Sequence, residues 1–208
     1  MLRIGTLFYI LLSLFYGLVA QAAEPAKIDS AIFDIKPRDY VYGNDDAKIE
    51  VIEYFSLTCP HCENFFVNIF PELKRDYIDT GKVKWIKRSF VTDQSSLKGT
   101  MLLYCVDKLD FEKYLRILLN KQSSWAYNQD PLPILKNIAL LGGMSSKKFS
   151  ECMGNKDLSQ EITVSANEAT RTLKLTGTPA FFINHEKVTL YTLKSFKDHL
   201  DKLLLAQQ

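Results

Sequence analysis

Two cysteines separated by two residues stand where a buried strand gives way to a helix, and this junction constrains the fold more than any other feature. Residues 48–57 (KIEVIEYFSL) are rich in β-branched and aromatic side chains, which is typical of a largely buried strand. Cys59 and Cys62 follow, and apolar side chains then recur at helical spacing to about Thr80. Residues 82–90 (KVKWIKRSF) predict a second strand, so the order indicates a right-handed βαβ unit.

The middle of the chain has a different pattern, because residues 95–173 carry apolar side chains at helical spacing. Strand patterns return over residues 180–190 (AFFINHEKVTL), which predict a hairpin, and Thr192 is placed to cap a last helix. The sequence therefore predicts an α/β fold in which an all-helical domain interrupts a βαβ…ββα domain. The βαβ…ββα domain is discontinuous and comprises residues 23–94 and 174–208.

Residues 1–22 form a separate segment with the pattern of a secretory signal peptide. Arg3 is the only charge before Glu24, an apolar stretch follows Arg3, and Ala20-Gln21-Ala22 supplies the small residues of a cleavage site. The alternative is a retained membrane anchor, since the apolar stretch is close to the length that spans a bilayer. Export implies an oxidising compartment in which disulfides persist.

Composition excludes several classes of protein. The chain has 208 residues, of which 47% are hydrophobic and 24% charged, as in ordinary globular domains, so collagen-like, low-complexity and disordered chains are excluded. The formal net charge is only +2, with no evident cluster of basic residues. The sequence therefore has no electrostatic footprint for nucleic acid.

The place of Cys59 at the start of a helix predicts reactivity. The first backbone N–H groups of a helix are unpaired and its dipole is positive there, so the pKa of Cys59 is expected to fall. His61 can add positive charge or a hydrogen bond, and Pro60 fits the first turn and stiffens the loop. Cys62 lies one turn deeper and is expected to be buried. Such a pair can cycle between dithiol and disulfide, and a stable thiolate makes the disulfide oxidising.

Two other interpretations of this cysteine pair remain open from the residues alone. One is half of a zinc site, which needs two more ligands, and His185 and His199 do not have the usual spacing. The other is a structural disulfide. We interpret both histidines as surface or boundary residues, because His185 falls in the predicted hairpin turn and His199 beside Leu200 on the last helix.

From residue 23 onward the chain resembles the DsbA family of periplasmic thiol:disulfide oxidoreductases, which has a thioredoxin fold. Glu53 lies six residues before Cys59, and Cys59-Pro60-His61-Cys62 has the dipeptide type of that family. A helical block interrupts the βαβ and ββα halves. Thr178-Pro179 precedes the AFFIN strand, where the family has a cis-proline. The match covers the whole chain after the predicted signal peptide.

The resemblance implies a role for each matching residue. Cys59 would be the nucleophile, Cys62 would resolve the mixed disulfide, and His61 would stabilise the thiolate. Pro179, in cis, would face the cysteine loop, while Thr178 would pair through its backbone with an extended substrate segment.

Glu53 is a charged residue in a strand that otherwise looks buried. The resemblance implies a buried acid that relays protons near Cys62, with a pKa raised by burial. The alternative is a glutamate at a strand end that reaches solvent or pairs with a lysine.

A second cysteine pair lies in the helical block. Cys105 and Cys152 each fall on the apolar side of a predicted helix. Free thiols are a liability in an oxidising compartment and an even count favours pairing, so we predict a Cys105–Cys152 structural disulfide. The alternative is two separately buried thiols.

The function that follows is donation of disulfides to unfolded or partly folded exported proteins. The resemblance implies a periplasmic protein that a membrane quinone reductase of the DsbB type re-oxidises. The sequence implies no metal or organic cofactor, and we expect a monomer because the segment before Lys48 is too short for a dimerisation domain. One alternative is a disulfide isomerase or reductase, because threonine before the cis-proline, here Thr178, is typical of isomerases. Against it, DsbC-type isomerases carry an N-terminal dimerisation domain, and the segment before Lys48 is too short for one. A second alternative is a non-enzymatic exported chaperone or binding domain with a structural Cys59–Cys62 bond.

Overall fold

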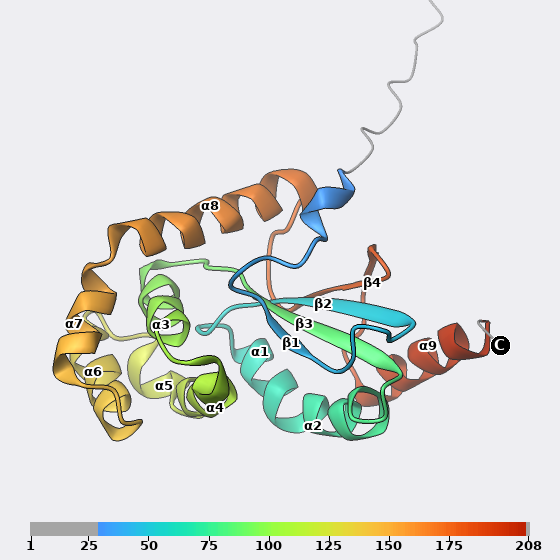
Figure 1. Cartoon of the computed structure of the whole chain (residues 1–208), viewed down its shortest axis with the longest axis horizontal. Coiled ribbons are helices and arrows are strands. Elements are labelled where there is room, and N and C mark those ends of the chain that lie inside the picture. Colours follow the sequence, from blue (N-terminus) through green and yellow to red (C-terminus); the bar gives the residue numbers. More distant parts are fainter. Residues whose placement is uncertain (1–28, 207–208) are drawn as a thin grey trace, which may run out of the picture.

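A mixed sheet lies at the centre of the structure, a computed structural model that describes residues 29–206 (Figure 1). Five strands follow one another in the order β1-β3-β2-β4-β5 within this described part. β2 and β3 are parallel, and the other neighbouring strands are antiparallel. The strands are β1 (Tyr40–Tyr42), β2 (Ile49–Phe55), β3 (Val83–Ser89), β4 (Ala180–Ile183) and β5 (Glu186–Val188).

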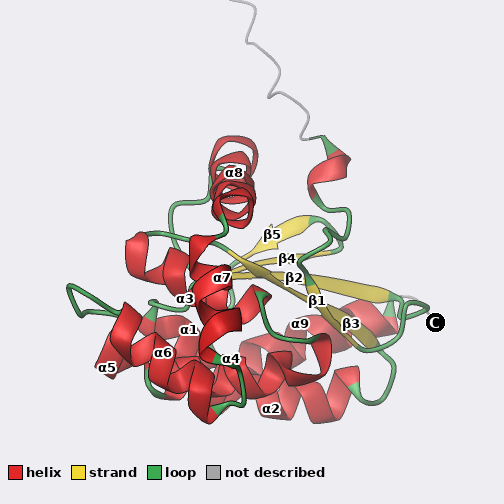
Figure 2. Cartoon of the chain, turned by 60° about the vertical axis from the view of Figure 1, so that its left-hand side comes forward, coloured by secondary structure: helices red, strands yellow, loops and turns green. Residues whose placement is uncertain are grey.

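Helices cover both faces of this sheet, as Figure 2 shows. On one face lies the helical stretch after Cys59, which contains α1 (Pro60–Asn64) and α2 (Phe70–Leu73), together with α9 (Leu193–Leu205). On the other face lies α8 (Lys156–Leu173). The remaining helices form a block beside the sheet: α3 (Gln94–Tyr104), α4 (Phe111–Asn120), α5 (Gln122–Trp125), α6 (Leu132–Leu141) and α7 (Ser146–Gly154). Two short 3-10 turns, Ser30–Ile32 and Lys108–Asp110, complete the described elements.

The predicted order of elements is confirmed, since β2, the Cys59 helix and β3 form a βαβ unit, and β4, β5 and α9 follow the helical block. Thr192 caps α9 in a reciprocal arrangement with Ser195, as the sequence predicts. β1 was not predicted. It has three residues and pairs along the outer edge of β3, and a segment so short shows no alternation from which a strand can be recognised.

The helical stretch after Cys59 is continuous from Pro60 to Ile78 but not uniform. Two of its turns, Phe65–Ile69 and Lys74–Ile78, are wider than α-helical and have the π form. Pro71 lacks a backbone N–H, and its ring would clash with the turn before it in a regular helix. The first wide turn lies directly before this proline, so we attribute the irregularity there to Pro71.

The two faces of the sheet bury separate hydrophobic cores. The core against α8 contains side chains from β2, β3 and β4, and Ala166, Ala169 and Leu173 supply its helical side. The opposite core is aromatic, with rings in contact across the sheet, the Cys59 helix and α9: Phe65, Phe70, Trp85, Phe181 and Phe196. The strand that leads to Cys59 is therefore packed on both faces.

One tryptophan joins the helical block to the strand end. Trp125 of α5 is fully buried, and its indole N–H donates to the Leu118 carbonyl oxygen at 2.9 Å. The indole packs on Gly99 of α3, where an added Cβ would lie 2.6 Å from Trp125 Cη2 and 3.2 Å from a methyl carbon of Leu57. Glycine is needed at this position because the indole occupies the space of a side chain.

A disulfide joins Cys105, at the end of α3, to Cys152 on α7. The two cysteines lie 47 positions apart, so the bond closes a large loop within the helical block. Closing such a loop restricts the unfolded chain.

The predicted signal peptide, residues 1–22, lies outside the described residues, so its presence and cleavage stay predictions. Within residues 29–206, no helix is both long and apolar enough to cross a membrane. The division into residues 23–94 with 174–208 and an inserted domain of residues 95–173 likewise stays a prediction.

Replacing Gly99 tests the contact between α3 and α5. We expect Gly99→Ala to lower the free energy of unfolding by about 1–3 kcal/mol, because the new methyl group would overlap the Trp125 indole. Gly154→Ala is the matched control, since nothing lies within 4 Å of the Cβ position there, and we expect a change below about 0.5 kcal/mol. Urea unfolding of both variants provides the comparison, and equal losses would contradict the packing argument.

Candidate active site

Cys59 occupies the position that precedes the first turn of α1. Its backbone is extended, with φ −88° and ψ 116°, and Pro60 follows as the first residue of the helix. The Cys59 carbonyl oxygen accepts the N–H groups of Cys62 at 3.1 Å and Glu63 at 3.2 Å. Both Cys59 and Cys62 are free thiols in this structure, Cys59 partly exposed and Cys62 buried. The structure places both cysteines at the strand–helix junction, as the sequence predicts.

The loop before β4 lies against the Cys59 sulfur. The Thr178–Pro179 peptide bond is cis, and the Cys59 thiol donates to the Thr178 carbonyl oxygen at 3.0 Å. The strand register explains this contact between segments 119 positions apart, because Ala180 at the start of β4 pairs with Tyr54 near the end of β2. The structure thus brings Thr178 and Pro179 to the cysteine pair.

The two thiols have opposite electrostatic environments. The hydrogen bond with the Cys62 thiol lowers the pKa of Cys59 to about 5, helped by the side chain of Thr178 and by the backbone N–H groups of Cys62 and His61, while partial burial opposes the shift. Burial raises the pKa of the Cys62 thiol well above its ordinary value, and the hydrogen bond with Cys59 adds to this. Cys62 is 1% exposed. Cys59 is therefore a thiolate near neutral pH and Cys62 a thiol. The hydrogen bond that Cys59 donates to the Thr178 carbonyl oxygen belongs to its protonated form.

A groove lies between His61, which separates the two cysteines in sequence, and the cis-proline loop. It has a volume of about 580 Å³ and is lined by His61, Thr178 and Pro179. Its apolar wall comes from the Cys59 helix, β4, β5 and the segment after β5: Phe65, Ile69, Phe181, Val188, Leu190 and Tyr191. His61 and Pro60 are exposed. An extended peptide bound at Thr178 has apolar surface available on this side.

Glu53 is buried beneath the helix and is paired. It is 1% exposed, and its Oε2 accepts from Lys87 Nζ at 2.5 Å and from the Trp85 indole N–H at 2.8 Å. Lys87, equally enclosed, lies 4.2 Å from the ring centre of Phe70. The two interpretations of Glu53 are thus combined, because the side chain is buried and also pairs with a lysine. Sequence reasoning missed Lys87, although opposite charges in two adjacent buried strands were a signal.

Two further contacts to the cysteine loop were also missed. The Thr58 hydroxyl donates to Asp93 Oδ2 at 2.7 Å, and Asp93 caps α3 by accepting the Ser96 N–H. Gln122 of α5 donates its side-chain amide to the carbonyl oxygens of Leu57 and Cys59. The Asp-x-x-Ser spacing was a sequence signal for the α3 cap. Gln122 had none, because its partners are backbone atoms that any residue could supply.

The remaining histidines lie away from the cysteines. His185 is in the β4–β5 turn, stacks on Phe33 with ring centres 4.6 Å apart, and has its Nε2 3.7 Å from Glu50. His199 is on α9. Over residues 29–206, no group of three or more histidine, cysteine or acidic side chains is arranged to hold a metal ion.

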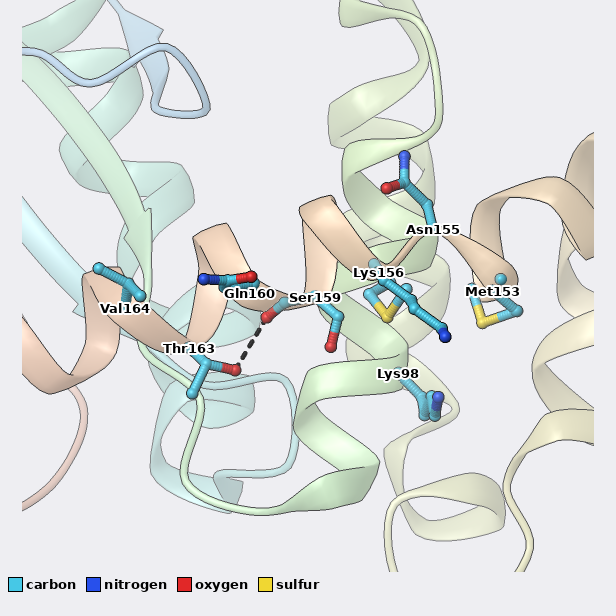
Figure 3. A pocket seen from close by; sticks show the side chains of 10 residues that line it. Lys98, Met153, Asn155, Lys156, Ser159, Gln160, Thr163 and Val164 are labelled. Atoms are coloured by element: carbon cyan, nitrogen blue, oxygen red, sulfur yellow. Dashed lines mark hydrogen bonds between the residues drawn. The ribbon is translucent and has the colours of Figure 1, made fainter.

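A second hollow lies between α3 and α8 (Figure 3). Its volume is about 350 Å³, and Lys98, Met153 and Lys156 are among the side chains around it. None of the residues that line it belongs to the cysteine loop or to the Thr178–Pro179 loop. This hollow is therefore separate from the cysteine pair and the cis-proline loop.

Comparison with known sequences gives a consistent family. The sequence profile of the thioredoxin family matches residues 36–202. A Rickettsia bellii protein provisionally named a protein-disulfide oxidoreductase is 34% identical over 83% of this chain. This chain spans 67% of the length of that relative and 64% of the length of a Rickettsia conorii relative with a similar name.

Comparison with solved structures agrees. The crystal structure of Wolbachia pipientis alpha-DsbA1 is 34% identical, with a TM-score of 0.76, and the match covers 84% of this chain and 94% of that one. Oxidised BdbD from Bacillus subtilis has the same fold at 19% identity, with a TM-score of 0.71 over 85% of this chain and 95% of that one.

The pH dependence of alkylation tests the Cys59 environment. We expect reduced protein to react with iodoacetamide at Cys59 at half the plateau rate near pH 5, while Cys62 stays unmodified in the folded state. A midpoint near the ordinary cysteine value of 9.0 would contradict the assignment. Mass spectrometry of quenched samples gives both rates.

The same lowered pKa affects stability, with a definite sign. A group with a depressed pKa stabilises the fold above its unfolded pKa, and this contribution is lost as the pH falls through the folded value. Reduced protein is therefore expected to gain stability relative to Cys59→Ser as the pH rises from about 5 to 9. Urea unfolding across this range measures the difference.

Proposed function

The chain belongs to the DsbA-like protein-disulfide oxidoreductases of the thioredoxin family, and on this premise we propose that it donates disulfide bonds to exported proteins. The observation that carries the proposal is the contrast between the two thiols. Cys59 is partly exposed with a pKa of about 5, whereas the pKa of buried Cys62 is raised. A stable Cys59 thiolate favours the reduced protein, which makes the Cys59–Cys62 disulfide a good oxidant.

Disulfide transfer then proceeds in two exchanges. In the first, a substrate thiolate attacks the Cys59 sulfur, the Cys59–Cys62 bond breaks, and the leaving Cys62 sulfur takes up a proton because its pKa is raised. In the second, another substrate thiolate attacks the substrate sulfur of the mixed disulfide. Cys59 leaves as a thiolate, and its low pKa makes it a good leaving group. Two electrons pass from the substrate to the protein.

Substrate binding is proposed at the cis-proline loop and the groove beside it. The Thr178 carbonyl oxygen lies 3.0 Å from the Cys59 sulfur, so backbone pairing at Thr178 would bring a substrate cysteine to that sulfur. Pro179 and His61 line the same groove. Its apolar wall suits the hydrophobic side chains that unfolded proteins expose.

The proposed partners follow from the family. They are unfolded or partly folded exported proteins and a membrane quinone reductase of the DsbB type, which would remove the electrons from the reduced pair. We propose a periplasmic monomer, with the Cys59–Cys62 pair as its only redox group and Cys105–Cys152 as a structural disulfide. The bond between Cys105 and Cys152 supports the last point, since it lies in the helical block, away from the groove.

Glu53 is proposed to assist the proton uptake of Cys62. Its carboxylate lies in the core on the same face of the sheet as the helix that carries Cys62, and Lys87 pairs with it there. The Lys87 ammonium group lies 5.2 Å from the ring centre of Phe66, a residue of that helix. The ion pair therefore lies against the helix that carries Cys62.

A pair of variants separates this role from stability. Glu53→Gln is expected to lower the free energy of unfolding by about 3–5 kcal/mol, because it leaves the Lys87 charge buried and unpaired. Glu53→Gln/Lys87→Met removes both charges and is expected to recover most of that loss. If Glu53 moves the proton, the double variant still releases Cys62 more slowly in single-turnover exchange. Release at the unaltered rate across pH 5 to 9 would contradict the proton role.

Two alternative functions, disulfide isomerase or reductase and a binding or chaperone domain, are each favoured by one feature of the structure. A disulfide isomerase or reductase shares the same cysteine chemistry, and Thr178 is the residue that favours it. A binding or chaperone domain needs no free thiol, and the groove of about 580 Å³ is the feature that favours it.

The reduction potential of the cysteine pair is the decisive test. Equilibration in glutathione buffers, with the dithiol fraction trapped and counted, is expected to give a potential well above the value of about −270 mV for thioredoxin. A value near that of thioredoxin would favour the reductase or isomerase. Cys59→Ala/Cys62→Ala is expected to abolish oxidation of a reduced, unfolded test protein, and surviving oxidation would contradict the assignment. Chaperone activity that persists in this variant would support the binding domain.

A further inference from the structure

One buried side chain of the helical block holds the backbone on both sides of Thr58. Gln122 is 5% exposed, and its Nε2 donates to the carbonyl oxygens of Leu57 at 2.9 Å and Cys59 at 3.1 Å. We infer that Gln122 is a positioning residue for the Cys59 thiol. The inference rests on the proposed redox function and extends it to a residue of the helical block, more than 60 positions away in sequence.

The contact depends on the chemistry of an amide. A glutamine side chain carries two N–H donors on one nitrogen, and here that nitrogen faces two carbonyl oxygens from alternate residues of one loop. An ionised carboxylate has no donor, and a thioether has none either. Leu57 is completely buried, so removal of the amide would leave its carbonyl without this partner and without access to water.

The backbone that Gln122 holds determines the surroundings of the sulfur. The Cys59 carbonyl oxygen that accepts from Gln122 also accepts from the N–H groups of Cys62 and Glu63, so one atom joins α5 to the first turn of α1. The Cys59 backbone is extended at this point, and its orientation sets the sulfur relative to the helix N-terminus. The N–H groups of Cys62 and His61 contribute to the lowered pKa of Cys59, after the larger contribution of the Cys62 thiol.

Gln122 is itself held firmly. Trp125, one turn along α5, is fully buried and hydrogen-bonded to the Leu118 carbonyl oxygen. The Tyr127 hydroxyl lies 3.5 Å from Gln122 Oε1 and 3.4 Å from the Thr58 carbonyl oxygen, on the exposed side of the same contact. Gln122 therefore transmits the rigidity of the helical block to the cysteine loop.

Loss of the amide has an expected direction. A looser Cys59 peptide disturbs the contacts that stabilise the thiolate, so the pKa of Cys59 rises and the reduced protein loses stability. The disulfide then becomes a weaker oxidant. A hydrogen bond of ordinary net strength corresponds to about a two- to tenfold change in the equilibrium constant with glutathione.

The test uses two variants and a matched control in the full chain. Gln122→Met keeps the length of the side chain and removes both donors, and Gln122→Glu replaces only the NH2 group. Gln129→Met makes the first of these substitutions at an exposed glutamine in the loop after α5. The dithiol fraction in glutathione buffers, the pH profile of Cys59 alkylation and the thermal unfolding of the oxidised form are measured for each.

We expect both Gln122 variants to shift the glutathione equilibrium toward the disulfide and the alkylation midpoint to higher pH, and Gln129→Met to match the unaltered protein. A lower unfolding temperature with both redox readouts unchanged would reduce Gln122 to a packing residue and overturn the inference. The proposed redox function would still stand after that result, provided that the cysteine pair of the unaltered protein is oxidising. An unaltered protein that does not exchange with glutathione would overturn the proposed function as well.

A measurement without any variant decides the matter if neither Gln122 variant folds. In reduced, ¹⁵N-labelled protein, the side-chain amide resonances of Gln122 are expected to shift with the titration of Cys59 near pH 5. The side-chain amide of Gln129 serves as the reference. Gln122 resonances that stay constant through that titration would overturn the inference.

Discussion

The candidate active site depends on one sulfur, that of Cys59, which is charged at the start of a helix. Cys59 accepts a hydrogen bond from the Cys62 thiol and interacts with the Thr178 side chain and with the first N–H groups of α1, and together these lower its pKa to about 5. The contributors come from two distant segments, which meet because β2 ends where the antiparallel β4 begins. The central place of β2 in the sheet is thus what assembles the site, and burial on both faces keeps that strand in place.

The helical block restrains the cysteine loop through hydrogen bonds. It contacts the cysteine loop at two places, through Asp93, which accepts from the Thr58 hydroxyl, and through Gln122, which donates to two loop carbonyl oxygens. Both residues lie at or near helix ends that are themselves fixed, one by a reciprocal cap and the other by the buried Trp125. The strand–helix junction would lack these restraints in a thioredoxin fold without an insertion. The insertion therefore contributes directly to the geometry of the thiol.

Sequence reasoning recovered the elements whose signals are local. β2 and β3 were predicted because each is a run of β-branched and aromatic side chains, and α9 because Thr192 and an apolar stripe mark its start and face. β1 was missed because its three residues have no periodicity and owe their conformation to pairing with β3. The sequence did not predict the wide helical turn before Pro71. A proline within a helix indicates that the helix is disturbed, but it does not indicate which backbone form the helix adopts.

By itself the sequence determined where the reactive pair lies and that this pair begins a helix. It also determined that one cysteine is more exposed than the other, because the second lies one helical turn further along. These properties depend on hydrogen bonds and periodicities within a few residues. Only the tertiary structure decided that Glu53 pairs with Lys87, that the Thr178 carbonyl meets the Cys59 thiol and that Gln122 holds the loop. Strand register and the packing of the helical block set those contacts, and two of the three involve backbone oxygens that every residue carries. A pattern of side chains along the sequence therefore cannot predict these contacts.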